Sequence, residues 1–218
     1  MVQRGQFLER PALIQVGDDL LDGLSHRGDR HPPLLILPPH PGEGPGMDHP
    51  LCAEIAWAAA TAGFPTLRFN FRGVGASQGK RTGPETDLAD ADAAIRLLME
   101  NAGVASAAAV GISGSAATVL ELFKLHPGMS GICLVQPVED VVSDLPRLSI
   151  PLLLVIGEAD PSIPSAALVA STTEADGRVE IIPHLDARLG RGLSEVGRAV
   201  VRWLEAIGPQ GKRRERPD

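Results

Sequence analysis

The sequence of 218 residues is poor in aromatic side chains, which make up 3% of it, and it contains only two cysteines. Cys52 falls in an expected helix and Cys133 in an expected buried strand, and this spacing gives neither a disulfide framework nor a cysteine-based metal site. No apolar run is long enough to span a bilayer, and Met1 to Arg10 lacks the apolar core of a signal peptide. We therefore expect a cytoplasmic protein without membrane contact.

Positive charge is also scarce, because the formal net charge is -7. A nucleic-acid surface usually needs a basic face, so we expect no nucleic-acid partner. The basic residues near the end, such as Lys212 and Arg213, fall in a tail over 208–218 that we predict to be disordered and solvated. The remaining residues 1–207 have a length and an apolar content typical of one globular α/β domain.

Strand-like and helix-like segments alternate along these residues. The strand-like segments are Leu34–Leu37, Pro65–Phe71, Ala105–Val110, Gly131–Val135, Pro151–Ile156 and Val179–Ile182, and the helix-like ones are Leu51–Ala62, Leu88–Leu98, Ala116–Leu125 and Leu193–Leu204. This alternation predicts a mostly parallel sheet with helices on both faces. We expect Ala12–Ser25 to add an antiparallel pair of strands at one edge.

A glycine-flanked serine lies between the third of these strands and its helix, in Gly111-Ile112-Ser113-Gly114-Ser115. A strand, a serine between small residues and then a helix is the layout of a nucleophile elbow, in which a tight turn raises the serine hydroxyl above the sheet edge. The usual pattern is G-x-S-x-G, and here the last position is Ser115. The elbow points to acyl transfer through Ser113, and an ordinary strand-to-helix turn is the alternative.

Two further segments carry a family resemblance. Pro38-Pro39-His40-Pro41 follows the first strand, and the segment Arg68–Gly79 at the end of the second reads RFNFRGVGASQG. With the elbow and Gly157–Asp160, these segments make the chain resemble the α/β-hydrolase superfamily over Leu34–Ile207. More narrowly, the chain is similar to small bacterial members with an HPHP-type loop and an RFNFRGxGxSxG segment.

The resemblance implies a three-layer αβα α/β-hydrolase fold with a mostly parallel central sheet. Many members carry a helical lid after the strand that ends here at Val135. The connection from Val135 to Pro151 is too short for one, so we expect no lid domain and a shallow, open site. Such a site favours small acyl esters or thioesters over long buried lipids.

A catalytic serine of this kind needs a histidine base and a carboxylate that orients it, and in this fold they follow in the order serine, acid, histidine. Asp160 fits the acid, in a turn before Pro161, and Asp140 and Asp144 are weaker candidates. The position that matches the family's histidine is Ala187, which cannot accept a proton. His184 is the sole histidine after Asp160, and it is the candidate base.

The same resemblance implies an oxyanion hole of two backbone N–H groups. Gly114 supplies one, and Gly42 is the expected second donor because Pro41 has no N–H; Glu43 is the other choice. We expect His40 and Glu43 to line the substrate site, with His40 mainly shaping its loop. If His184 does not reach Ser113, His40 is the other imidazole near this edge of the sheet.

Glycines after the second strand suggest a phosphate loop, but the sequence does not fit one. A Walker A motif needs a glycine where Val74 stands and a serine or threonine where Arg81 stands. We expect no metal and no organic cofactor. Two functions remain open: a serine hydrolase acting on a small-molecule acyl substrate, and a degenerate hydrolase fold that binds a ligand or protein. A homodimer also remains open.

Overall fold

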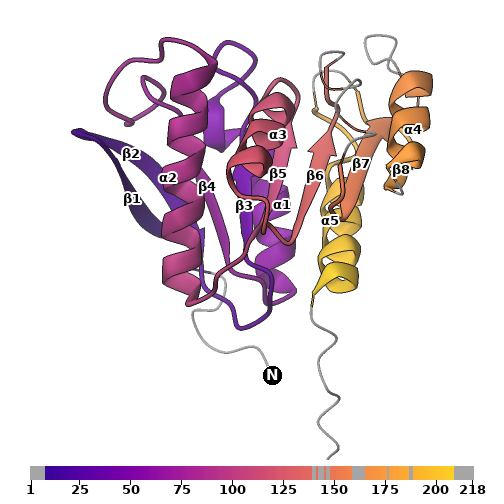
Figure 1. Ribbon diagram of the computed structural model, residues 1–218, viewed down its shortest axis with the longest axis horizontal. Coiled ribbons are helices and arrows are strands. Elements are labelled where there is room, and N and C mark those ends of the chain that lie inside the picture. Colours follow the sequence, from indigo (N-terminus) through magenta and orange to yellow (C-terminus); the bar gives the residue numbers. More distant parts are fainter. Residues whose placement is uncertain are drawn as a thin grey trace, which may run out of the picture.

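An eight-stranded sheet runs through the part of the chain that our computed structural model describes, which is residues 8–138, 141, 145, 148–158, 165–175, 177–186 and 189–208 (Figure 1). The strand order is β1-β2-β4-β3-β5-β6-β7-β8. The antiparallel pairs are β1 with β2 and β2 with β4, and all other neighbours are parallel. The strands are β1 (Arg10–Val16), β2 (Asp19–His26), β3 (Leu34–Leu37), β4 (Thr66–Phe69), β5 (Ala108–Ile112), β6 (Gly131–Val135), β7 (Leu152–Gly157) and β8 (Arg178–Ile182).

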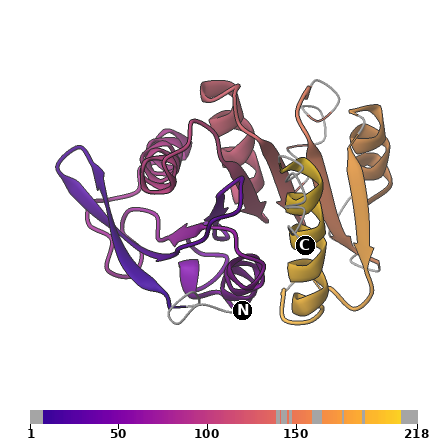
Figure 2. The same ribbon diagram turned by 90° about the horizontal axis from the view of Figure 1, so that it is seen from below.

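Helices cover both faces of this sheet, as Figure 2 shows. One face carries α2 (Pro84–Ala102), α3 (Ser115–Leu125) and α4 (Ser165–Glu174), and the other carries α1 (Pro50–Thr61) and α5 (Leu193–Ile207). Alternate residues of the strands belong to two apolar cores, one on each face of the sheet. In β3, for example, Leu35 faces the α2 and α3 side while Ile36 faces the α1 and α5 side. The central strands are therefore buried on both faces and apolar throughout.

The arrangement confirms the predicted fold class, a three-layer αβα architecture with a mostly parallel sheet. The antiparallel pair expected within Ala12–Ser25 is present as β1 and β2. The described residues between β6 and β7 form no α-helix, in agreement with the expected absence of a lid domain. Helix α4 was not predicted, because its residues are small and show no clear apolar stripe. Residues 209–218 of the predicted tail lie outside the described residues. The domain boundary predicted at residue 207 stays a prediction.

The parallel strands direct several loops to one edge of the sheet. β3, β5, β6 and β7 all end there, so the segments that follow Leu37, Ile112, Val135 and Gly157 are neighbours. Ligands of open α/β sheets bind outside the carboxyl ends of the strands. Ser113 and Gly114, which follow β5, and His40 and Glu43, which follow β3, therefore lie at this edge.

Gly111 allows α3 to pack closely against β5 at this edge. A Cβ atom on Gly111 would lie 2.8 Å from Ala116 Cα and 2.8 Å from Ser115 O, both of which are backbone atoms that cannot yield easily. The first glycine of the elbow pattern is thus a packing requirement. By contrast, a Cβ atom on Gly128 would meet nothing within 4 Å.

We predict that Gly111→Ala lowers the free energy of unfolding by about 1–3 kcal/mol, because the added methyl overpacks the junction of β5 and α3. Urea unfolding followed by circular dichroism measures the difference. Gly128→Ala is the matched control and should stay within about 0.5 kcal/mol of the parent. Equal stabilities of the two variants would contradict this account of the junction.

Candidate active site

Ser113 lies on the turn between β5 and α3, where the sequence places it. Its φ angle is 53°, in the left-handed region that non-glycine residues rarely adopt. The side chain is partly buried, and the backbone N–H donates to Val135 O at 2.9 Å. Such strained backbone is typical of functional positions. The Ser113 side chain makes no hydrogen bond to another residue in the described parts of the chain, so its hydroxyl is available.

Ser115, where the usual pattern has glycine, holds the turn together. Its side chain is fully buried, and its Oγ accepts a hydrogen bond from Ile112 N–H at 2.8 Å. The same Oγ lies 2.9 Å from Ile112 O and 3.2 Å from Leu37 O, so the hydroxyl proton can be donated to either carbonyl. The serine therefore ties the start of α3 to the ends of β5 and β3.

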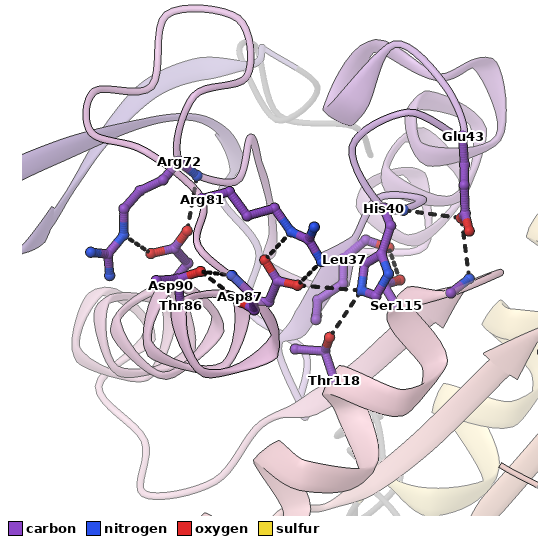
Figure 3. Close-up of polar contacts among 12 residues, drawn as sticks. Leu37, His40, Glu43, Arg72, Arg81, Thr86, Asp87, Asp90, Ser115 and Thr118 are labelled. Atoms are coloured by element: carbon purple, nitrogen blue, oxygen red, sulfur yellow. Dashed lines mark hydrogen bonds and ion pairs between the residues drawn. The ribbon is translucent and has the colours of Figure 1, made fainter. Parts of the chain in front are cut away.

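Gly114 brings two loops into contact beside Ser113. Its N–H donates to Glu43 Oε2 at 3.3 Å, and the His40 N–H donates to the same oxygen at 3.2 Å (Figure 3). A Cβ atom on Gly114 would lie 2.8 Å from His40 Nδ1 and 2.9 Å from Glu43 Oε1, so a larger residue would displace one or both of these side chains. One predicted oxyanion donor, Gly114, thus already holds a carboxylate. The role of Gly42 as the second donor stays a prediction.

The His40 side chain is fixed from the side opposite Glu43. Its Nε2 atom lies 3.3 Å from Thr118 Oγ1 and 3.6 Å from Asp87 Oδ2. The Asp87 carboxylate is fully buried and accepts two hydrogen bonds from Arg81, at 2.7 and 2.6 Å. The ring also packs edge-on against Phe71. These contacts support the expected role of His40 in shaping its loop.

Buried Asp87 and partly exposed Arg81 form an ion pair that the sequence analysis missed. The hydrogen bond to Asp87 raises the pKa of the Arg81 guanidinium. Bidentate pairs of this kind are among the stronger polar contacts, and here the pair anchors the loop before α2 beside His40. In the sequence this pair is visible only as an arginine followed by an acidic residue in the first turn of a helix. Acidic residues are common at helix starts, so the pattern by itself does not predict an ion pair.

A second buried carboxylate, Asp90, ties down the neighbouring loop. It accepts from Arg72 Nε at 2.6 Å and from the Arg72 backbone N–H at 2.9 Å. Burial raises the pKa of the Asp90 carboxyl above its ordinary value, although both bonds oppose that shift. The glycine-rich segment after β4 is thus held as a tight loop by protein contacts.

Of the proposed base and acid, the structure describes the base, His184, but not the acid. His184 lies just after β8 with a φ angle of 67°, is exposed, and makes no hydrogen bond or ion pair within the described chain. Asp160 and Ala187 lie outside the described residues, as do Asp140 and Asp144. The structure therefore brings together Ser113 and the predicted oxyanion region, and the roles of His184 and Asp160 stay predictions.

Gln136 is another residue that the sequence analysis missed. It directly follows β6, is buried, and has a φ angle of 48°. Its side-chain Oε1 accepts a hydrogen bond from Gly157 N–H at 2.8 Å, and its backbone N–H donates to Val155 O. Gln136 thereby links the ends of β6 and β7 next to the elbow.

Neither cysteine competes with Ser113 as a nucleophile. Both are buried, and burial raises the pKa of Cys52 to about 12 and also raises that of Cys133. A thiol needs to ionise to react, so these side chains serve as packing groups. Among the residues described here, no cluster of three or more histidine, cysteine or acidic side chains could hold a metal ion. No described helix is long and apolar enough to cross a membrane.

A cavity of about 520 Å³ lies away from Ser113, between the β1–β2 hairpin and the carboxyl end of α2. Its lining includes Arg10, His26 and Asn101. These residues lie toward the amino ends of the parallel strands, where α/β sheets rarely bind substrates. We therefore place the candidate active site at Ser113.

No protein-family model matches the chain. A curated relative, the uncharacterized protein RP471 of Rickettsia prowazekii, is 31% identical over 107 residues. The match covers 49% of this chain and 45% of that protein, so it spans less than half of either.

Solved structures match over nearly the whole chain. ATU1826 of Agrobacterium tumefaciens, a protein of unknown function, has a TM-score of 0.80 and 21% identity, with 92% of this chain and 99% of that chain covered. XC6422 of Xanthomonas campestris, described as an α/β serine hydrolase without a lid, has a TM-score of 0.76 and 18% identity, with 92% and 95% covered.

We predict that Ser115→Ala lowers the free energy of unfolding by about 1–3 kcal/mol, because the Ile112 N–H loses its buried acceptor. Thermal or urea unfolding measures the change. Ser194→Ala, which removes an exposed hydroxyl bonded to exposed Glu195, is the control and should cost less than about 0.5 kcal/mol. If the two alanine variants are equally stable, Ser115 does not hold the turn.

The structures of ATU1826 and XC6422 each match 92% of this chain. At this level of identity the likeness concerns the fold alone. The chain has the α/β-hydrolase fold.

Proposed function

We propose that the chain is a serine hydrolase that cleaves small ester or thioester substrates through an acyl-enzyme on Ser113. The observation that carries this proposal is the left-handed backbone of Ser113 on a strand-to-helix turn, directly before an N–H group of Gly114 that binds an anion. This combination presents a hydroxyl and an oxyanion donor side by side, which acyl transfer requires.

In the proposed reaction the Ser113 hydroxyl attacks the acyl carbonyl carbon. A histidine, His184 by its order in the chain, accepts the hydroxyl proton while Asp160 orients its ring. The carbonyl oxygen becomes an oxyanion that the Gly114 N–H stabilises. Collapse of this intermediate releases the alcohol or thiol, which takes the proton from the imidazolium. Water then attacks the acyl-enzyme by the same steps and releases the acid.

The proposed substrate size rests on the surroundings of Ser113. No described α-helix covers the site between β6 and β7, and Glu43 beside the elbow is exposed. The similar protein XC6422 is described as a serine hydrolase without a lid, in keeping with an open site. An open site offers little apolar surface to a long acyl chain, so short acyl groups are the expected substrates.

A second function is favoured by a specific observation. The Gly114 N–H is occupied by Glu43, and exposed His184 has no hydrogen-bond partner in the described chain. With alanine at position 187, these features fit a degenerate hydrolase fold that binds a ligand or a protein partner without turning over substrate. The two functions differ in whether Ser113 reacts.

We predict that a fluorophosphonate probe labels the wild-type protein and that Ser113→Ala abolishes labelling. His184→Ala should lower the labelling rate by about 10²–10⁴-fold, the usual contribution of a general base. In-gel fluorescence against time measures both. His126→Ala is the histidine control. His126 lies at the carboxyl end of α3, at the opposite end of the helix from Ser113, and pairs with Asp92 of α2. This variant should be labelled at the parent rate.

An unlabelled wild-type protein would contradict the hydrolase and support the binding module. Labelling that survives His184→Ala unchanged would keep the hydrolase but remove His184 as its base. The same assay on His40→Ala then tests the other imidazole at this edge.

A further inference from the structure

The Glu43 carboxylate bridges two backbone N–H groups beside Ser113. Its Oε2 atom accepts from the Gly114 N–H at 3.3 Å and from the His40 N–H at 3.2 Å. These donors come from two different segments, the start of α3 and the loop after β3, and they converge on one oxygen atom (Figure 3). Convergence of two backbone N–H groups from these two places is the geometry of an oxyanion hole.

We propose that the N–H groups of His40 and Gly114 form an oxyanion pocket, and that Glu43 is an internal competitor that decides which ligands enter it. The competing role in catalysis rests on the function proposed above, whereas occupancy of the pocket by a carboxylate does not. The ligand class is small molecules that present a carboxylate or a strongly polarised carbonyl oxygen.

The pocket itself is firmly held. The His40 ring is fixed by Thr118 and by buried Asp87, which is itself paired with Arg81. The His40 carbonyl accepts from the Glu43 N–H at 2.9 Å, which closes the loop into a turn. Because these contacts hold the main chain, the two donor N–H groups stay in place whether or not the Glu43 side chain is bound.

The Glu43 side chain, in contrast, is easy to displace. Glu43 is exposed, and its hydrogen bonds of 3.2 and 3.3 Å lie at and beyond the long end of the roughly 2.7–3.2 Å range of N–H···O bonds. A long side chain also loses rotamer freedom when it is held in one place. A ligand oxygen that makes shorter bonds to the same donors would therefore replace it.

Glu43 must also leave before an acyl group can react. The carboxylate and a developing oxyanion carry the same charge and need the same two donors, so they cannot share the pocket. With Glu43 bound, neither of these two N–H groups is free to stabilise a tetrahedral intermediate at Ser113. Weakly polarised carbonyls should thus be excluded, and activated acyl compounds and organic acids should compete best.

Acetate titration followed by ¹⁵N-resolved NMR tests the occupancy without any need for activity. The amide signals of Gly114 and His40 report acetate in the pocket. If Glu43 fills the pocket about nine-tenths of the time, the pocket is free for about a tenth of the time. Its apparent Kd for acetate is then about tenfold above the intrinsic value. We expect Glu43→Ala to bind acetate at both amides about tenfold more tightly than the parent, and Glu43→Gln to fall between.

Glu85→Gln is the matched control. Glu85 is an exposed acidic residue in the first turn of α2 at the same edge of the sheet, and it makes no hydrogen bond or ion pair within the described chain. This variant removes one negative charge without touching the pocket, so it should bind acetate as the parent does. If acetate moves neither amide in Glu43→Ala, or binds it no more tightly than the parent, the proposal is wrong.

The catalytic consequence is measured with the fluorophosphonate probe on the same variants. Glu43→Ala should react at Ser113 about tenfold faster than the parent, and Glu85→Gln at the parent rate. A rate that is unchanged or lower in Glu43→Ala would overturn Glu43 as a competitor. If Ser113 reacts in none of the variants, the hydrolase fails, and the acetate titration alone decides the occupancy.

Discussion

The left-handed backbone at Ser113 is held by packing on both sides of a single turn, and the chemistry of the site depends on that turn. Upstream, Gly111 lets the helix approach the strand; downstream, Ser115 Oγ binds the backbone of the strand end. Because α3 begins immediately afterwards, the Gly114 N–H at its N-cap has no carbonyl partner within the helix. The Gly114 N–H is therefore left to bind an anion next to the serine hydroxyl. In the proposed hydrolase, this one local distortion supplies both the nucleophile and its anion donor.

Two buried carboxylates on α2 fix the loops around this turn. Burying a carboxylate is costly unless it is paired, and Asp87 and Asp90 are each bonded to an arginine from the segment between β4 and α2. Asp87 also approaches His40 from the loop after β3. The main chain of the loop after β3 is thereby fixed, while Glu43 remains exposed. This division between a fixed frame and a displaceable side chain underlies both proposals.

The fold could be predicted from the sequence because its signals are local and repeated. Buried strands such as Gly131–Val135 are short apolar runs, and their alternation with helical patterns leaves few arrangements of a parallel sheet. The turn at Ser113 was predictable for the same reason, since small residues follow one such strand. Helix α4 was missed because a run of small residues shows no apolar stripe.

The contacts of the site were not predictable in the same way. Glu43 and Gly114 are far apart in the chain, and so are His40 and Asp87. Each pair meets only because β3 and β5 are adjacent in the sheet and α2 packs beside them. The sequence predicted Gly114 as an oxyanion donor and Glu43 as a residue lining the site, but it could not show that the Gly114 N–H donates to the Glu43 carboxylate. Such contacts require the register of the strands.

The most direct measurement is peptide mapping by mass spectrometry after brief reaction with p-nitrophenyl acetate and acid quenching. This experiment looks for the covalent intermediate itself. The account predicts an acetyl group on the peptide that contains Ser113, and more of it in a variant that lacks the Glu43 carboxylate. An acetyl group on other residues alone, or no acetyl group in either protein, would contradict Ser113 as the nucleophile of this fold.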